Sequence, residues 1–544
     1  MKKIVLTMMM ASVITGAYAQ DTYESARLLG NDLNGTARYV GMGGALEALG
    51  ADISTTSTNP AAVGMFRHSI ISGSIGVVSQ QEANTYDGLS KTNFSFDQLG
   101  FVYSMQTNST SFLNLSFNYH KSRNFDQILS AANSLRGSSI NKMVYMKDGL
   151  NSDQQGGYCL DENNDGDVIG WEDATSDYRA LTFSQVDYLT VNTLMQDPND
   201  PDPKPFYYYD GNQFAFDRAH RGWISDFDIN VSGNINNRIY LGATLGIHSV
   251  NYNGFSQYTE QLVNVKNENI GTVEIADERK ITGSGVDLKL GAIFRPLEES
   301  PFRLGVFLST PTWYDLETKN HTEIYNRTSE GTHSRGRNAD GYDSYEFKFY
   351  TPWKFGLSLG HTIGNYLALG ATYEYTDNSA ADIRELTGTY DEYDNKNSES
   401  DKAMNANVEK TLKGVSTVKL GLEFKPDPML AVRFGYNYVS PMYNKNGMRD
   451  MQINSYGVMY SSTTDYTNWK DTHRITCGLG YKTGNVNIDL AYQYSVTNGD
   501  FYPFQSTIDH LDGNYNLTTT YNYSTPTSVN FKRHQVLLTV GCTF

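Results

Sequence analysis

The chain is long, acidic and rich in tyrosine and glycine. Its 544 residues include 39 Tyr, 25 Phe and 48 Gly but only 14 Pro, and its formal net charge at pH 7 is −17. A chain this acidic offers no basic face to phosphate groups, so we expect no nucleic-acid partner. Its three cysteines are too few to cross-link a chain of this length, which excludes a fold held together by disulfide bonds.

Residues 1–19 have the pattern of a cleavable signal peptide. Two lysines precede an apolar stretch from Ile4 to Ile14, and Ala17-Tyr18-Ala19 is the small-x-small pattern that signal peptidase cuts. No cysteine follows this position, so we expect no N-terminal lipid anchor. Past residue 19, no apolar run approaches the ~18 residues that a spanning helix needs.

Many segments alternate strictly between apolar and polar residues, which is typical of a β-strand with two different faces. In VNIDLAYQYSV, residues 486–496, every second side chain is apolar and those between are polar or small. Segments 286–294, 367–375 and 432–438 repeat the pattern. A membrane barrel produces it over about ten residues per strand, because one face meets lipid and the other meets the lumen.

The same test along the whole chain predicts fourteen strands joined alternately by short turns and long loops. Outer-membrane barrels have an even strand number, short periplasmic turns and long outer loops. A secreted β-sandwich or propeller, the alternative, has no reason to separate its loops by length. The predicted strands are 69–80, 94–107, 111–122, 222–235, 238–253, 281–297, 301–316, 345–361, 365–381, 411–427, 430–446, 468–484, 486–502 and 528–544.

These strands predict an all-β fold, a 14-stranded antiparallel transmembrane β-barrel over residues 69–544 with a long outer loop at about 123–221. Pro311 and Pro352 are expected at outer strand ends, because a proline in a strand centre would break the ladder. An aromatic girdle is expected from four tryptophans at the same ends: Trp223, Trp313, Trp353 and Trp469.

The last strand, HQVLLTVGCTF, alternates to a terminal Phe544. It resembles the C-terminal assembly signal of outer-membrane barrels. The expected partners are therefore the barrel-assembly machinery, outer-membrane lipid and lipopolysaccharide. With the signal peptide, this predicts export to the cell outer membrane, where a monomer is expected.

Residues 20–68 do not alternate and are predicted to form a compact, glycine-rich hatch inside the barrel. A short helical piece is expected at 45–49, ended by Gly50 as a C-cap. GMGGAL at 41–46 is not a nucleotide loop, because it lacks the third glycine of GxGxxG and follows no strand. Small residues here would let the hatch backbone approach the barrel wall closely.

The hatch resembles the N-terminal hatch of FadL/TodX-type transporters, outer-membrane channels for long-chain fatty acids and other hydrophobic compounds. The resemblance rests on these segments: Gly35-Thr36-Ala37-Arg38, Gly44-Ala45, Ala51-Asp52-Ile53-Ser54, and Asn59-Pro60-Ala61 before Met65-Phe66. It implies a fourteen-stranded barrel, a hydrophobic ligand, and a hatch-positioning role for Asn59, Pro60 and Ala61. The loop at about 123–221 is longer than the family's, so no ligand-contact residue is carried over.

The sequence shows no sign of catalysis, and we do not expect an enzyme. GxSxG and HExxH are absent, and the histidines lie far apart in the sequence. Charged residues on the predicted lumen faces are interpreted as a paired polar interior that holds the hatch, and a substrate path is the second reading. They are Asp226, Asp228, Asp287, Lys289, Lys354, Glu374, Lys419, Glu423, Arg433 and Asp489.

One segment of the long outer loop fits the twelve-residue calcium loop. Its candidate ligands are Asp161, Asn163, Asp165, Asp167 and Glu172, with Gly166 at the sharp turn. An ordinary acidic surface loop is the alternative. No other cofactor is expected, and Ca²⁺ here would be structural.

The sequence thus predicts a channel that takes up hydrophobic small molecules. In the family, the ligand is captured by outer loops, passes a moving hatch and leaves sideways through the wall. Two alternatives remain open. The family also contains barrels that serve a secretion system as protein-binding shuttles, and a nonspecific porin would have a similar barrel.

The calcium loop gives a first prediction. Isothermal titration of the purified protein with Ca²⁺ should show a single site that is lost in Glu172→Ala, because that residue supplies two oxygens of the shell. Absence of calcium heat from the wild-type protein would leave only the acidic-loop reading.

Overall fold

The computed structural model describes residues 20–144, 160–162, 168–171, 184–193, 209–329, 331–336, 343–511 and 517–544. It is a closed antiparallel barrel with fourteen positions around its wall, as predicted. Each position, here called a stave, is one strand or two strands in line. The wall strands are β1 Ile70–Gln80, β2 Thr92–Asn108, β3 Ser111–Asn124, β7 Asp210–Ile235, β8 Ile239–Val263, β9 Asn269–Phe294, β10 Arg303–Ser309 with β11 Trp313–Thr328, β13 Asp343–Tyr350 with β14 Lys354–Ile363, β15 Leu367–Asp377, β18 Gly414–Asp427, β19 Leu430–Val439, β20 Tyr466–Thr483, β21 Val486–Tyr502 and β24 Thr527–Thr543.

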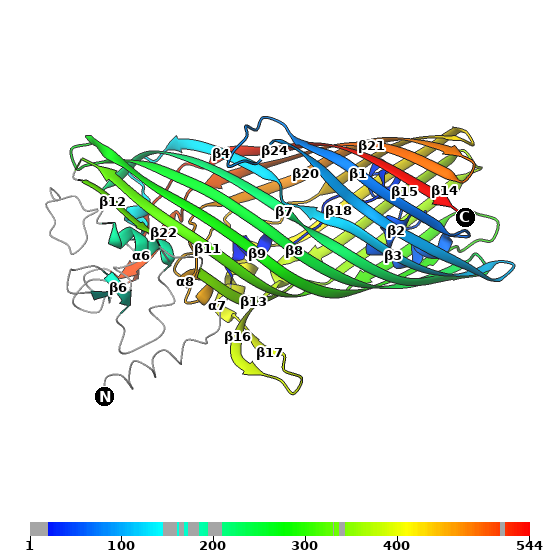
Figure 1. Cartoon of the computed structure of the whole chain (residues 1–544), viewed down its shortest axis with the longest axis horizontal. Coiled ribbons are helices and arrows are strands. Elements are labelled where there is room, and N and C mark those ends of the chain that lie inside the picture. The colour runs from blue at the N-terminus through cyan, green and yellow to red at the C-terminus, as the bar shows by residue number, and fades with distance from the viewer. Residues whose placement is uncertain are drawn as a thin grey trace.

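The barrel closes between its first and last strands. β1 pairs with β24 along its whole length, from Ile70 opposite Thr543 to Gln80 opposite Arg533. This seam leaves neither strand with a free edge, which is the condition for a sheet to lie in lipid. The short turns and the C-terminus lie at one end of the barrel, and the hatch lies inside it (Figure 1).

An apolar belt covers the outer surface next to the short turns. On β9, the outward side chains from Val286 to Phe294 are apolar, whereas those from Thr272 to Ser284 are mostly polar or charged. Trp313 and Trp353 are 42% and 47% exposed and mark the same upper boundary on the next two staves. The belt has the pattern expected for a lipid-facing band with an aromatic rim. Among the described residues, no helix is long and apolar enough to span a membrane.

Three neighbouring strands are much longer than predicted. β7, β8 and β9 contain 26, 25 and 26 residues and run along the whole barrel (Figure 1). Part of the long outer loop belongs to this wall, since β4 (Gln127–Ser134) pairs with the upper half of β7. The prediction stopped where the outer face changes from apolar to polar, but hydrogen bonding between strands continues there.

Two staves predicted as single strands are interrupted, and this corrects the placement of two prolines. Pro311 separates β10 from β11 and Pro352 separates β13 from β14, so both lie within the wall, between two strands, and not at its outer edge. β10 pairs with β14, and β11 pairs with β13. The two breaks therefore face each other, because a residue without an N–H cannot continue a ladder.

The remaining elements form the hatch and the outer parts of the molecule. The hatch contains α2 (Thr22–Ala26), α3 (Ala37–Gly41), η1 (Ile53–Ser57) and η2 (Pro60–Met65). The outer elements are β5 (Leu160–Glu162), β6 (Val168–Trp171), α6 (Gln185–Asn192), β12 (Gly331–Gly336), η3 (Asn378–Ala380), β16 (Asp382–Tyr390), β17 (Lys396–Ser400), α7 (Lys402–Thr411), α8 (Tyr456–Met459), β22 (Thr507–Leu511) and β23 (Leu517–Tyr521). The helix predicted at 45–49 was wrong. That segment is a turn, in which Gly50, at φ 68°, donates its N–H to the carbonyl of Leu46.

The seam gives a second prediction. The N–H of Phe544 donates to the carbonyl of Ser69 at 2.9 Å, which is the last bond of the closing pair. Deletion of Phe544 should slow the appearance of heat-modifiable barrel on gels while export of the chain is unchanged. Phe544→Tyr keeps the aromatic terminus and should assemble normally. A deletion that assembles at the wild-type rate would contradict a role for this terminus.

Candidate functional site

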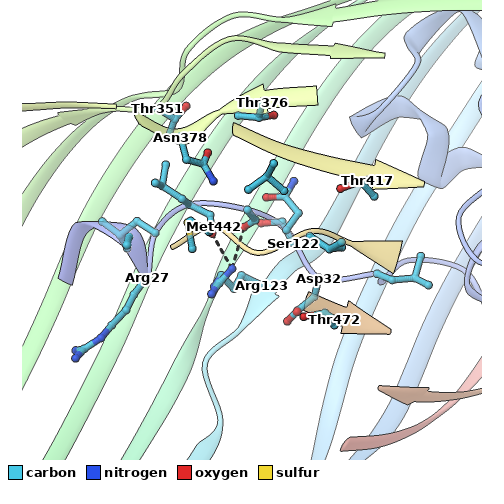
Figure 2. Close-up of a pocket in the computed structure, with 18 of the residues that line it drawn as sticks. Arg27, Asp32, Ser122, Arg123, Thr351, Thr376, Asn378, Thr417, Met442 and Thr472 are labelled. Carbon is cyan, nitrogen blue, oxygen red and sulfur yellow. Dashed lines mark hydrogen bonds between the residues drawn. The ribbon is translucent and has the colours of Figure 1, made fainter. Parts of the chain in front are cut away.

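A cavity of about 380 Å³ lies between the hatch and the inner wall of the barrel. This volume falls within the range typical of small-molecule pockets. Hatch residues from Tyr23 to Asn34 form one side, and inner faces of the wall strands form the others. Figure 2 shows Arg123 and the hatch residue Asp32 in the lower part of the view, with Thr351, Thr376 and Asn378 in the upper part.

The Asn-Pro-Ala segment seats the hatch against the wall. Asn59 and Ala61 are fully buried, and the amide of Asn59 donates to the carbonyl of Glu47 at 3.0 Å. Two wall glycines leave room for this segment. A Cβ on Gly291 would come 2.0 Å from Oδ1 of Asn59, and one on Gly242 would come 2.5 Å from the carbonyl of Pro60. Any larger residue there would push the hatch from the wall.

Two further segments that carried the family resemblance contact each other inside the hatch. The hydroxyl of Thr36 lies 2.9 Å from both carboxylate oxygens of Asp52. The N–H of Thr36 donates to Oγ of Ser54 at 2.8 Å. Each side chain also caps a short helix, since Thr36 precedes α3 and Asp52 precedes η1. These bonds fix the two halves of the hatch together.

Ion pairs join the hatch to wall residues that the sequence placed on the lumen face. Nζ of Lys419 lies 2.9 Å from Glu47 of the hatch and 2.6 Å from Glu374. Arg38 of the hatch reaches Glu423 at 3.2 Å. The interpretation of these wall charges as a paired interior that holds the hatch therefore agrees with their positions.

Three arginines surround a single hatch carboxylate at the cavity wall. Arg533 and Arg474 lie 3.3 and 3.8 Å from Asp32, and both side chains are at least nine-tenths buried. Arg123, the third, donates to the carbonyl of Leu29. Burial alone would raise the pKa of Asp32, but the three guanidinium groups outweigh it and lower the pKa to about 2. The cluster therefore holds three cationic groups and one carboxylate.

Two of these arginines have a guanidinium N–H group without a hydrogen-bond partner among the described residues. Nη1 of Arg474 donates to Asn437 at 2.8 Å, but Nε of Arg474 and Nε of Arg533 have no hydrogen-bond partner among the described residues. Buried donors without partners are costly, so the cluster is not fully satisfied by the protein alone. This side of the cavity therefore carries an excess of positive charge.

A second cluster brings together charged residues from three neighbouring strands, β7, β8 and β9. His248 lies between two carboxylates, at 2.7 Å from Asp226 and 3.1 Å from Asp287. Lys289 lies 2.9 Å from Asp287 and 3.0 Å from Asp228. Because each charge has an opposite neighbour, this side of the cavity is internally paired. Among the described residues, no group of three or more His, Cys, Asp or Glu is arranged to hold a metal ion.

The two facing breaks in the wall border the cavity. Thr310, Thr312, Thr351 and Pro352 all line it. Only a few bonds cross the gap, such as the N–H of Thr312 to the hydroxyl of Thr351 at 2.8 Å. The exposed Trp313 and Trp353 adjoin the breaks on the outside, at the top of the apolar belt. The wall is therefore least regular where the cavity meets the lipid-facing surface.

The structure also covers the cavity from the outer side. Tyr23 stacks on Tyr443 of an outer loop, with ring centroids 5.3 Å apart, and packs against Tyr466 at 5.0 Å. Trp469, which was expected in the aromatic girdle, instead lines the cavity. The strand irregularity between Trp469 and Thr472 accounts for this, because it shifts the alternation of β20 by one face.

The calcium loop lies largely outside the described residues. Asn163, Asp165, Asp167 and Glu172 belong to segments that the structure does not describe, and only the backbone of Asp161 is placed, in β5. β5 pairs with β6, which brings the two flanks of the loop together. The calcium assignment stays a prediction.

Sequence reasoning missed the arginine cluster and the histidine of the second cluster. Arg474 and Arg533 lie on the polar face of alternating strands, so the pattern contained them. Their meeting around Asp32 could not be predicted, because alternation gives the face of a residue but not its neighbours on other strands.

Comparisons with known proteins found similar solved structures. A FadL homologue of Pseudomonas aeruginosa is 12% identical, with 97% of this chain and 100% of that chain covered and a TM-score of 0.46. The toluene transporter TbuX of Ralstonia pickettii is 11% identical, with 94% and 99% covered and a TM-score of 0.46. The toluene transporter TodX of P. putida is 11% identical, with 94% and 99% covered and a TM-score of 0.43. No family model and no curated protein matches the chain.

Proposed function

We propose that this protein is an outer-membrane channel for the uptake of hydrophobic small molecules that carry an anionic head group, such as long-chain fatty acids. The observation that carries the proposal is the cavity whose wall holds three arginines around one carboxylate. A carboxylate head would balance the excess guanidinium charge, and the apolar tail would lie along Tyr23, Tyr443 and Trp469.

The exit path is the break in the wall at Pro311 and Pro352. An apolar tail that leaves a protein pocket for water loses about 25 cal/mol per Å² of apolar surface, so a path from cavity to lipid is favoured. The break joins the cavity to the top of the apolar belt. Hatch movement at Asn59-Pro60-Ala61 would open the way, and the solute would leave sideways into the membrane.

Export and membrane insertion belong to the same proposal. Cleavage after Ala19 releases a chain that begins at Gln20, and the barrel-assembly machinery recognises the strand that ends at Phe544. The outer apolar belt contacts lipid, and the surface beyond it contacts lipopolysaccharide. A Ca²⁺ bound by the loop at 161–172 would order the outer face.

Two other functions make different demands on the lumen. A nonspecific porin needs a continuous aqueous path, but the hatch is buried in the lumen and is joined to the wall by ion pairs. A shuttle for exported proteins needs only the outer surface, so loss of the cavity arginines would leave it active. Measurements on the cavity and on the hatch therefore separate the three functions.

The ligand class is tested by neutralising the arginine cluster. Arg474→Gln and Arg533→Gln should each weaken binding of a long-chain fatty acid by about tenfold, because a hydrogen bond to a charged group contributes about 1.5 kcal/mol or more. Binding of the fatty alcohol of the same length should be unchanged. Native mass spectrometry or titration of the detergent-purified protein measures both.

Lys470→Gln is the matched control for this test. Lys470 also lines the cavity, but its side chain is 52% exposed and pairs with Asp500. Its replacement should leave fatty-acid binding near the wild-type value. Equal loss of acid and alcohol binding in the arginine variants would contradict recognition of an anionic head.

The hatch is tested separately. Removal of residues 20–58 should raise ion conductance in planar bilayers, because those residues occupy the lumen. Pro60→Gly should alter uptake of a hydrophobic substrate without unfolding the barrel, since it frees the backbone where the hatch meets the wall. Pro428→Gly, in an exposed short turn, is the control. Closed conductance and unchanged uptake after hatch removal would favour the shuttle.

A further inference from the structure

The residue at the proposed cleavage point, Gln20, is completely buried. It follows Ala17-Tyr18-Ala19 directly, and its exposed fraction is 0%. Gly457 of α8 packs against it so closely that a Cβ there would come 2.9 Å from the carbonyl of Gln20. Cleavage after Ala19, as proposed above, would therefore give this chain a buried N-terminus.

The charges around Gln20 are already balanced. Asp21 and Glu24 are the neighbouring acids, and Arg449 and Arg279 are the neighbouring bases. Arg449 pairs with both acids and Arg279 pairs with Glu24. All four side chains are at least nine-tenths buried. The surrounding charges are balanced too, because Asp465 and Asp277 face the same two arginines and are accompanied by Arg27 and Arg218. A free N-terminal ammonium would add a fifth cation to four carboxylates, and an unbalanced buried charge is strongly unfavourable.

The side chain of Gln20 can remove this charge. Its Nε2 donates to Glu24 at 2.5 Å, whereas its Oε1 has no hydrogen-bond partner among the described residues. An N-terminal glutamine has its α-amine within reach of its own Cδ, because attack closes a five-membered ring. No other residue at this position offers both the amine and a side-chain amide at that spacing.

We propose that Gln20 is cyclised to pyroglutamate in the mature protein. The α-amine nitrogen forms a bond to Cδ, the Cδ–Nε2 bond breaks, and the amide nitrogen leaves as ammonia. The reaction is neither an oxidation nor a reduction and needs no co-reactant. The product is a neutral lactam whose remaining N–H takes the place of Nε2 as the donor to Glu24.

The product fits its surroundings better than the amine does. The lactam has one donor and one acceptor and carries no charge, so the balance of Asp21 and Glu24 against Arg449 and Arg279 is kept. Because Gln20 has no exposed surface in the folded barrel, ring closure precedes enclosure of the hatch. The modification is therefore a step of maturation that occurs before the N-terminal segment is sealed under α7 and α8.

Mass spectrometry of the protein purified from outer membranes tests this directly. The intact mass identifies the cleavage site, and the N-terminal peptide shows whether the first residue is lighter than glutamine by one ammonia. We expect cleavage after Ala19 and a blocked, cyclised Gln20. A different cleavage site would refute the proposed processing, whereas a free glutamine amine after the expected cleavage would refute only the cyclisation.

A variant tests the consequence for stability. Gln20→Asn keeps the amide and the amine, but its ring would have four members and cannot form. The thermal midpoint of this variant in detergent should lie below that of the wild-type protein near neutral pH. The difference should shrink as the pH rises above about 8, where an α-amine loses its charge. A difference that does not depend on pH would mean that packing, and not charge, is responsible, and would overturn the argument from charge.

Discussion

Lipid offers no partner for a backbone N–H or C=O, and this constraint determines the rest of the molecule. The wall must close on itself, which the pairing of β1 with β24 achieves. Fourteen closed staves enclose a lumen that wall side chains alone cannot fill. The hatch fills part of it, and the wall accommodates the hatch by placing glycines such as Gly242 and Gly291 where the two backbones meet.

Charge balance distinguishes the structural parts of the lumen from the part for which we propose a binding role. Around Glu47 and Lys419, and around His248, each charged side chain meets an opposite one, so these groups hold the hatch and wall together. The arginines near Asp32 are different, because they outnumber the carboxylate and keep free donors. Such an excess is expensive in a buried place unless something else completes it.

The sequence allowed the fold to be predicted in detail but the site only in part. Alternation along strands such as 486–502 is a local property, so strand positions and the barrel class could be read from it. The register between strands is not local, and the meeting of Arg474, Arg533 and Asp32 depends on it. Pro311 was placed at an outer strand end because proline cannot continue a hydrogen-bonded ladder. The structure meets the same restriction inside the wall, where the break at Pro311 lies opposite a second break at Pro352.

The length of β7, β8 and β9 determines how far the barrel wall extends beyond the membrane. At about 3.3 Å per residue, the 26 residues of β9 extend roughly 85 Å, or about 60 Å along the axis at a tilt near 45°. The hydrocarbon core accounts for only about 30 Å of this. The wall therefore rises beyond the lipid as a collar about as tall as the membrane part. Its rim lies about 30 Å beyond the hydrocarbon core, so a molecule that approaches the outer end of the barrel contacts protein before it contacts lipid.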